Sequence, residues 1–462
     1  MNEAYEHAII VIVDQLRADY ICPELTPNLT RIFKLDSEER PGWDVCYAPT
    51  LTETCHATLS TVSTPGEHGV IGDGSFSRDT GRYELYKERF LDRYWNDNNP
   101  SLLTTLATRS GLRVVAVAGK DVVVDLLASS DIYLKVKLAL LEEGGSYEVN
   151  ATGVPSGVST LFLRRIEQAG LTKLSAADAR TPILDRHVSS LATTGLNMLR
   201  PQERCLLVMG LSALDRVGHK YGPNKDERNV AEAIRIADEE IGRVWRAALT
   251  KIHADPSSDA DSAPILLVVT GDHGCRLISN AIIPSKLGAG WERLDLWQTQ
   301  PEGQDSLRTA SLAIPSEIRS LVAHAESDGG TIRFWLNDRG STAALERWVL
   351  DARFSNGSFL HNFISEVYGT QGTSEELFQY ARHDNLGDLV VVAGEDCAFF
   401  KPNWIDDLVR EQGKGTIPIG EHGTHFPSDR LVPCLLPHTL QLPDAGHDRL
   451  SDQLLRLLGL VT

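Results

Sequence analysis

Acidic side chains and histidines recur in four short segments of the sequence, with the residue types that divalent metal ions bind. The residues concerned are Asp14, Asp215, His219, Asp272, His273 and His422. Carboxylate oxygens and imidazole nitrogens are the ligands that zinc and comparable ions take in proteins. Two sets of such ligands suit a two-metal site, with the ions roughly 3.5–4 Å apart.

Each of these segments has a plainer interpretation when it is taken alone. An Asp directly after a buried strand, such as Asp14, is more often a helix cap than a metal ligand. Asp215 and His219 stand four residues apart, which also suits a simple hydrogen bond along one helix face. The metal hypothesis therefore depends on all four segments meeting in the fold.

A fifth segment, PTLTETCHATLST, offers a hydroxyl nucleophile at Thr52 and is followed by PGEHGV. A hydroxyl becomes a useful nucleophile at neutral pH when a metal lowers its pKa, and a helix beginning just after it would stabilise an incoming anion. By itself the segment is better explained as a threonine-rich capping turn.

The segments that must position these side chains are continuous apolar runs with no alternating polar positions, which indicates strands buried on both faces. Three such runs are His7–Val13, Cys205–Gly210 and Ile265–Thr270. A weaker fourth run is Leu112–Ala118, and a fifth is Leu389–Ala393. A helical pattern covers Asn229–Thr250. Alternating strands and helices predict an α/β fold with a doubly wound parallel sheet, which binds ligands at the carboxyl ends of its strands. That rim would carry Asp14, Lys120, Asp215 and Asp272.

The order of the five segments resembles the alkaline phosphatase superfamily. Within it, the resemblance is to the branch of type I phosphodiesterases/nucleotide pyrophosphatases, phosphonoacetate hydrolase and related bacterial phosphomonoesterases. In that branch a PT-x-T-x-x-x-H segment precedes P-x-x-HG, and the interval fits when Thr52 is the nucleophile and His68 the later histidine. Thr50 and Thr54 do not fit this register.

The resemblance implies an α/β/α sandwich with a central, mostly parallel sheet and one or more inserted cap subdomains. We expect the catalytic core to comprise residues 1–293 and 416–462, with a possible small insertion at 129–181. Residues 294–415 lie between two of the chemical motifs and have mixed helix and strand signals, so they are expected to form the inserted cap region.

The resemblance also implies a ligand set and a mechanism. One ion would be held by Asp14, Thr52, Asp272 and His273, and the other by Asp215, His219 and His422. His422 is preferred to His425 because GEHGT keeps the family's spacing to a downstream D-x-x-VP segment. Thr52 would attack phosphorus in line and form a phosphothreonine. Zinc is the expected metal, with manganese or iron as alternatives.

Three expected substrate-binding positions depart from the family. Relatives place Asn three residues after the nucleophile, where this chain has Cys55, a poor donor. The monoesterases use an Asn after the HG element and a Lys-x-Arg pair; here Lys120 is retained, Asp73 stands in place of the Asn, and Val122 stands in place of the Arg. Loss of the Arg and the added carboxylate disfavour a dianionic monoester more than a monoanionic diester.

Composition restricts the partners. The 462 residues include 45 Lys and Arg against 63 Asp and Glu, a formal charge of −18, which argues against a groove for a nucleic-acid polymer. No run approaches the roughly 18 apolar residues of a membrane helix, so we expect no membrane partner. Seven scattered cysteines without a CxxC pair indicate a reduced, cytoplasmic setting.

The predicted function is two-metal-dependent hydrolysis of a small-molecule phosphoric ester, of the phosphodiesterase or pyrophosphatase type. A phosphomonoesterase and a phosphonate C–P hydrolase are the alternatives within hydrolases. A phosphoryl mutase or an inactive metal-binding protein are alternatives of another class. The partner would be a small phosphate ester or phosphonate, and the sequence leaves the oligomeric state and the organic portion of the substrate open.

Overall fold

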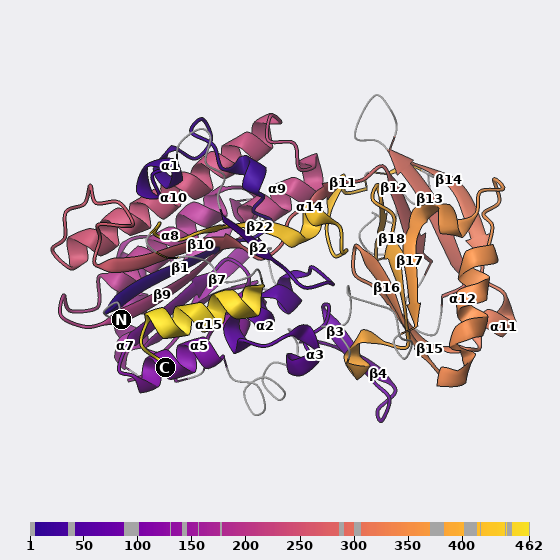
Figure 1. Cartoon of the computed structure of the whole chain (residues 1–462), viewed down its shortest axis with the longest axis horizontal. Coiled ribbons are helices and arrows are strands. Elements are labelled where there is room, and N and C mark those ends of the chain that lie inside the picture. The colour runs from indigo at the N-terminus through magenta and orange to yellow at the C-terminus, as the bar shows by residue number, and fades with distance from the viewer. Residues whose placement is uncertain are drawn as a thin grey trace.

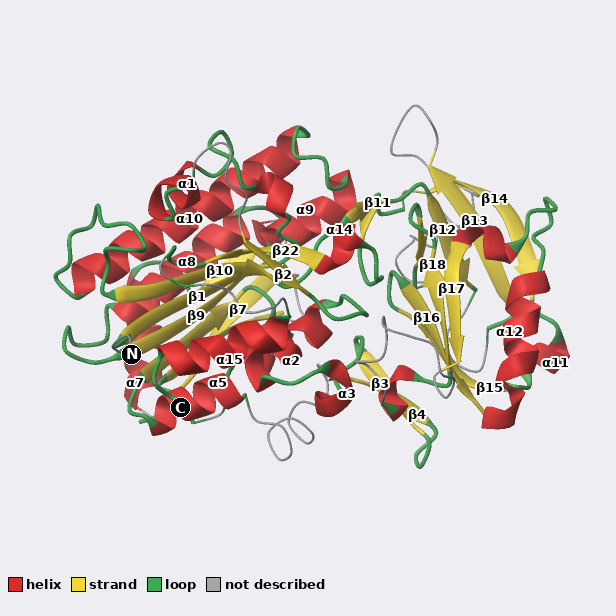
Figure 2. Ribbon diagram, in the orientation of Figure 1, coloured by secondary structure: helices red, strands yellow, loops and turns green. Residues whose placement is uncertain are grey.

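The computed structural model describes residues 5–35, 42–86, 101–129, 131–140, 146–155, 157–175, 178–285, 291–299, 306–369, 383–401, 414–415, 417–438, 440 and 446–461. Figure 1 shows a large sheet with helices on both faces beside a second part built mainly of strands. Figure 2, in the same orientation, shows the same division by secondary structure.

The central sheet has nine strands in the order β2-β22-β10-β1-β9-β5-β6-β7-β8. Their bounds are β2 (Gly42–Val45), β22 (Leu431–Leu435), β10 (Ile265–Gly271), β1 (His7–Val13), β9 (Cys205–Leu211), β5 (Arg113–Ala118), β6 (Leu134–Leu140), β7 (Ser146–Thr152) and β8 (Lys173–Ser175). The strands from β10 to β6 run parallel, and β22, β2, β7 and β8 each join an antiparallel pair. The mostly parallel sheet and its four predicted strands are thus confirmed.

Helices cover both faces of this sheet, which completes the predicted α/β/α sandwich. One face packs against α2 (Thr52–Thr61), α5 (Leu102–Arg109), α6 (Asp121–Leu127) and α15 (His447–Leu457). The other packs against α1 (Pro27–Ile32), α7 (Gly157–Gln168), α8 (Ile183–Leu196), α9 (Ala213–Tyr221) and α10 (Arg228–Lys251). The two faces are buried in separate apolar cores, which explains why the strands lack polar positions.

The second part contains two further sheets, of five strands (β19-β12-β13-β14-β20) and four strands (β15-β16-β18-β17). Their bounds are β12 (Asn280–Pro284), β13 (Arg293–Thr299), β14 (Ser306–Ala313), β15 (Val322–Ser327), β16 (Thr331–Leu336), β17 (Ile364–Gly369), β18 (Leu389–Ala393), β19 (Cys397–Phe399) and β20 (Lys414–Gly415). One apolar core joins residues of both sheets to α11 (Ser316–Arg319) and α12 (Thr342–Asp351). β12 precedes the expected boundary at residue 294, and the division into core and cap stays a prediction.

The remaining elements are short. They are α3 (Pro65–His68), α14 (Pro427–Arg430), the hairpin β3 (Gly74–Ser77) and β4 (Arg82–Leu85), the pair β11 (Arg276–Leu277) and β21 (Gly420–Glu421), and the 3-10 turns η1 (Ala18–Tyr20), η3 (Asp178–Arg180), η5 (Arg339–Ser341), η6 (Leu360–Phe363) and η8 (Asp384–Leu386). Among the described residues, no helix has the length and apolarity needed to span a bilayer.

The register of the parallel strands sets where the site forms. Val13 at the end of β1 lies opposite Leu211 of β9 and Gly271 of β10, so the three strands end at the same level. Asp14 and Asp272 are the next residues on two adjacent strands. Their carboxylates therefore meet at the carboxyl rim, where the sequence placed them.

Candidate functional site

Thr52 is the first residue of helix α2 and lies at the centre of the site. Its Oγ1 is 3.3 Å from Nε2 of His273 and 3.2 Å from Nζ of Lys120. The N-terminus of a helix carries a partial positive charge, which favours an anionic oxygen there. The neighbouring threonines have structural roles, because Thr50 Oγ1 donates to the Thr424 main-chain oxygen (3.0 Å) and Thr54 Oγ1 accepts from the Gly72 amide (3.0 Å).

A first group of metal-ligating side chains consists of Asp14, Asp272 and His273. Nε2 of His273 lies 3.4 Å from Asp14 Oδ1 and 3.4 Å from Asp272 Oδ2. Oδ1 of Asp272 accepts hydrogen bonds from the amides of Gln15 (3.0 Å) and His273 (2.8 Å), whereas its Oδ2 is buried and accepts none. The carboxylate is thus held through one oxygen and presents the other to the group.

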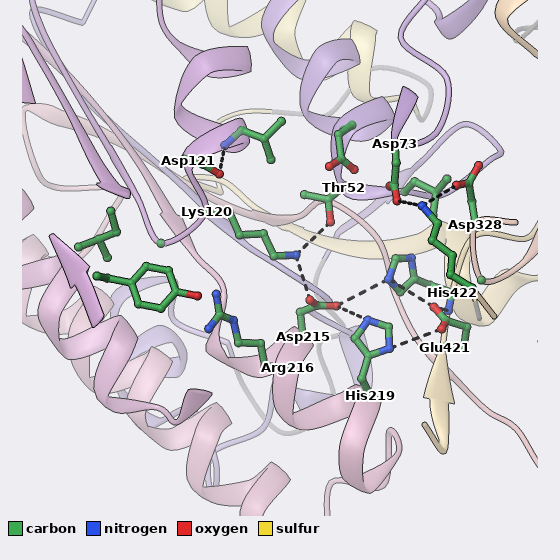
Figure 3. Close-up of a pocket in the computed structure, with 18 residues that line it drawn as sticks. Thr52, Asp73, Lys120, Asp121, Asp215, Arg216, His219, Asp328, Glu421 and His422 are labelled. Atoms are coloured by element: carbon green, nitrogen blue, oxygen red, sulfur yellow. Dashed lines mark hydrogen bonds and ion pairs between the residues drawn. The ribbon is translucent and has the colours of Figure 1, made fainter. Parts of the chain in front are cut away.

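We call Asp215, His219 and His422, with Glu421 beside them, the second group; it adjoins the first, because His273 also clusters with Asp215 and His422. Asp215 Oδ1 lies 3.2 Å from Nε2 of His219 and 3.7 Å from Nε2 of His422. Glu421 Oε2 lies 3.7 Å from Nδ1 of His219. Figure 3 shows these four side chains converging, Asp215 and His219 from helix α9, Glu421 from β21, and His422 from the residue after β21.

The three imidazoles share one hydrogen-bonding arrangement. Nδ1 donates to a main-chain oxygen in each, from His273 to Gly274 (3.0 Å), from His219 to Gly420 (2.9 Å) and from His422 to Thr50 (2.8 Å). Since a carbonyl oxygen only accepts, Nδ1 carries a proton in each ring, and Nε2 is the nitrogen that faces the carboxylates of the site. That is the arrangement found around metal-ligating histidines.

Burial of these carboxylates is electrostatically costly without added positive charge. Burial raises the pKa of Asp272 to about 7. Burial, reinforced by the charges of Asp215 and Asp272, raises the pKa of Asp14 well above its usual range. For Asp215 burial opposes ionisation, but the ammonium of Lys120 and the imidazole of His219 hold its pKa well below the ordinary value. The donor set and the unpaired Asp272 oxygen fit divalent cations in both groups.

A cavity of about 490 Å³ opens above Thr52 and the second group. It is lined by Leu51, Thr52, Glu53, Asp73, Gly119, Lys120, Asp121, Val122, Leu138, Tyr147, Asp215, Arg216, His219, Asp328, Gly329, Lys401, Glu421 and His422. Lys120 reaches across it, with Nζ 2.5 Å from Asp14 Oδ2 and 2.9 Å from Asp215 Oδ2. Val122 lines the same wall, as expected for the position where relatives carry Arg.

Asp73 lines the cavity, but it is paired with a lysine from the second part of the molecule. Its Oδ2 lies 2.7 Å from Nζ of Lys401, which also lies 3.0 Å from Glu326 Oε1 and 3.7 Å from Asp328 Oδ1. The sequence argument counted Asp73 as an added negative charge with no compensating cation. Lys401 supplies that cation from 328 positions along the chain.

Cys55 does not line the cavity, in contrast to the other expected substrate-binding residues. It is 1 % exposed and packs with Cys46 and Val432 beneath helix α2. Three residues along a helix turn a side chain by about 300°, so spacing from Thr52 alone did not decide which way it faces.

Three residues that the sequence reasoning missed also line the cavity or its rim. Glu421 directly precedes the predicted His422, so the GEHG segment itself was the available signal. Glu53 directly follows Thr52, and burial raises its pKa to about 8. Lys401 left no local signal, because only the folded chain brings it to Asp73.

The family comparison agrees with this geometry. A family model described as type I phosphodiesterase/nucleotide pyrophosphatase matches residues 8–425. The chain belongs to this family. Membership supports hydrolysis of phosphoric esters as the class of reaction. No curated protein matches the sequence.

Similar solved structures have the same fold at low sequence identity. Phosphonoacetate hydrolase from Sinorhizobium meliloti, in complex with phosphonoformate, is 16 % identical with a TM-score of 0.59, over 98 % of this chain and 96 % of that one. An inactive variant of murine ectonucleotide pyrophosphatase/phosphodiesterase 5, in complex with AMP, is 15 % identical with a TM-score of 0.59, over 99 % and 96 %. The alkaline phosphatase PafA is 13 % identical with a TM-score of 0.60, over 94 % and 91 %. These matches confirm the alkaline-phosphatase-like fold.

Proposed function

We propose that this family member hydrolyses a small-molecule phosphoric diester or pyrophosphate with the help of two divalent metal ions, through a phosphothreonine at Thr52. The observation that carries the proposal is the position of Thr52 Oγ1. It stands at a helix N-terminus, within 3.3 Å of a histidine from the first ligand group and 3.2 Å of a lysine that contacts Asp215 of the second. A threonine that only capped a helix would need neither neighbour.

The residues of the chain divide the proposed chemistry between them. Asp14, Thr52, Asp272 and His273 would hold one ion, and Asp215, His219 and His422 the other, with Glu421 beside the second set. When bound, such ions lower the pKa of a coordinated hydroxyl and stabilise the charge on phosphoryl oxygens. Zinc suits this mixture of carboxylate and imidazole ligands, and the proposal keeps manganese and iron as alternatives.

Thr52 would attack the phosphorus atom, forming an O–P bond as the ester oxygen departs, and water would then cleave the phosphothreonine. The N-terminus of helix α2 favours the anionic phosphoryl group. Lys120 would carry positive charge to the same place, because its Nζ lies beside the Thr52 hydroxyl. The wall formed by Val122 and Tyr147 would contact the organic portion of the substrate.

Substitution of Thr52 tests the proposal. Thr52→Ala should lower turnover by at least about a thousandfold, while the metal content stays the same because the Asp and His ligands remain. Thr54→Ala is the matched control, since it removes a threonine hydroxyl two residues away whose observed contact is with the Gly72 amide. Assays would use nitrophenyl diester, monoester, phosphonate and sulfate substrates. An active Thr52 variant with an inactive Thr54 variant would contradict the assignment.

A phosphomonoesterase is the second candidate, and Lys401 is the observation that favours it. Because Lys401 pairs with Asp73, the cavity opposes a dianion less than the sequence alone suggested. The absence of Arg at Val122 still favours the diester. The ratio of diester to monoester efficiency in the same panel decides between the two.

A further inference from the structure

A separate cluster of metal-ligating side chains lies beneath helix α2, outside the cavity. It consists of Cys46, which follows β2, Cys55 in α2, and His447, the first residue of α15. The two Sγ atoms and an imidazole nitrogen all lie within 4.8 Å of one another. The three residues are at most 1 % exposed. Nothing in the proposed hydrolysis uses them.

Asp44 lies beside this cluster, in contact with His447, and is the nearest carboxylate that could complete it. Its Oδ1 accepts hydrogen bonds from the amides of Val45 (2.8 Å) and Gly446 (3.0 Å). Its Oδ2 is buried, accepts no hydrogen bond, and lies 3.4 Å from Nε2 of His447. The carboxylate is therefore fixed through one oxygen and presents the other to the imidazole, as ligating carboxylates do.

The distances in the cluster match the edges of a zinc tetrahedron. With Zn–S near 2.3 Å and Zn–N and Zn–O near 2.1 Å, tetrahedral angles place nitrogen about 3.6 Å from sulfur and about 3.4 Å from oxygen. Nε2 of His447 lies 3.6 Å from Sγ of Cys46 and 3.4 Å from Oδ2 of Asp44. Two of the three edges that the imidazole would share thus have the lengths that a zinc ion requires, and the third, to Cys55 Sγ, is within 4.8 Å.

We propose that Cys46, Cys55, His447 and Asp44 bind a structural zinc ion, separate from the catalytic ions. Four protein ligands leave no open position, and thiolates are ligands that select zinc over magnesium or calcium. Binding replaces the two thiol protons, which leave to solvent as the Zn–S bonds form. One of these protons is the one that Cys46 donates to the Asp272 main-chain oxygen, 2.6 Å away.

The alternative for Cys46 and Cys55 is a disulfide bond, and the burial of both thiols argues against it. Both thiols are enclosed in the folded protein, so an oxidant in solution cannot reach them. A zinc ion can enter as the chain folds, because metal binding and folding are coupled. The finding of a Cys46–Cys55 disulfide in protein purified without reductant would overturn the proposal.

The site would tie the end of β2 and the start of α15 to the nucleophile helix α2. β2 and α15 are separated by about 400 residues, and Cys55 stands one turn after Thr52 in α2. Ser451 of α15 also donates to the Leu59 main-chain oxygen of α2 (2.6 Å). Zinc bound here would therefore position Thr52 without touching substrate.

X-ray absorption at the zinc edge tests this on the unmodified protein. The proposed catalytic ligands contain no sulfur, so a Zn–S shell near 2.3 Å can come only from the cysteine cluster. We expect about three zinc ions per chain and a sulfur count averaging about two-thirds per ion, since two sulfurs are shared among three ions. A zinc-replete protein with no sulfur shell would overturn the proposal while leaving the hydrolase assignment intact. A sulfur shell in a protein that hydrolyses none of the substrates would support the structural zinc site and contradict the hydrolase assignment.

Substitutions localise the ion. Cys55→Ser and His447→Gln should each remove about one zinc per chain and, with that ion, the whole sulfur shell. Cys397→Ser is the matched control, because Cys397 is an equally buried thiol in β19 of another sheet. Equal zinc content in all three variants would contradict the assignment. If the cluster variants do not fold, the absorption spectrum of the unmodified protein still decides the question.

Discussion

The charge of Asp73 makes the substrate preference of this site testable by a single substitution. Asp73→Asn keeps the shape of the side chain and removes one negative charge from the cavity wall. Lys401 should remain in place and protonated, because Glu326 lies 3.0 Å from its Nζ and Asp328 3.7 Å. The substitution therefore makes the electrostatic potential of the cavity more positive by one charge, although Asp73 is paired in the parent protein.

The separation of the two charges sets the size of the effect. Thr52 and Asp73 line the same cavity, so a phosphoryl group at Thr52 shares that cavity with the Asp73 carboxylate. With an effective dielectric constant near 20, one pair of charges 6–10 Å apart interacts by about 1.7–3 kcal/mol. A dianionic monoester carries one more charge than a monoanionic diester. The ratio of kcat/KM for monoester over diester should therefore rise by roughly 20- to 150-fold.

The assay compares a nitrophenyl monoester and a nitrophenyl diester on both proteins, at one pH and ionic strength. Asp79→Asn is the control, because Asp79 is exposed at the turn of the same β3–β4 hairpin and its loss changes the net charge equally. A ratio for Asp73→Asn within twofold of the parent would refute the reasoning. An equal shift in Asp79→Asn would show that overall charge, and not the cavity, sets the preference.

Four further predictions follow from the same contacts. Val122→Arg combined with Asp73→Asn should favour the monoester by a further 1–3 kcal/mol or so in transition-state terms, if the guanidinium reaches the phosphoryl group, and kinetics on both substrates measure this. Lys401→Met leaves Asp73 and Glu326 without their shared cation, so the free energy of unfolding should fall by about 3 kcal/mol, which denaturant titration checks against the unchanged protein. Removal of metal by a chelator should abolish activity, and added zinc should restore it. His273→Ala should lower the catalytic metal content by about one ion, and metal analysis giving unchanged content would contradict the ligand assignment.

The apolar pattern of the sequence predicted the central strands well. A strand buried on both faces needs a continuous run of apolar residues, and a helix or turn of the same length does not. The same pattern could not assign a strand to a sheet. Leu389–Ala393 was predicted from the same kind of run as β1, and it does form a strand, β18. β18 pairs antiparallel with β16 and β17, away from the central sheet. Burial on both faces determines which residue types a strand contains. Which strands it pairs with is determined by contacts between residues that are far apart in the sequence.

The candidate site shows the same division. Asp14 and Asp272 were predictable because each directly follows a strand, and the register of β1 and β10 then brings them together. Lys401 was not predictable, since no feature near residue 401 marks it as a neighbour of Asp73. Cys55 was predicted from its spacing to Thr52 alone, and the helix turns it toward Cys46.

The balance of charge around the cavity explains why a residue from the second part of the molecule matters to the proposed reaction. Six carboxylates line the cavity against three Lys and Arg side chains, and Asp14 and Asp272 lie just behind it. An anionic phosphoryl group needs further positive charge to bind there, and two divalent ions would offset most of the difference. The net charge of the cavity is then close to zero, so a single charged side chain changes its sign. Lys401, at the boundary with the second part, is the side chain placed to do this, so we expect related chains to change substrate charge preference by changes at this position while keeping the metal ligands.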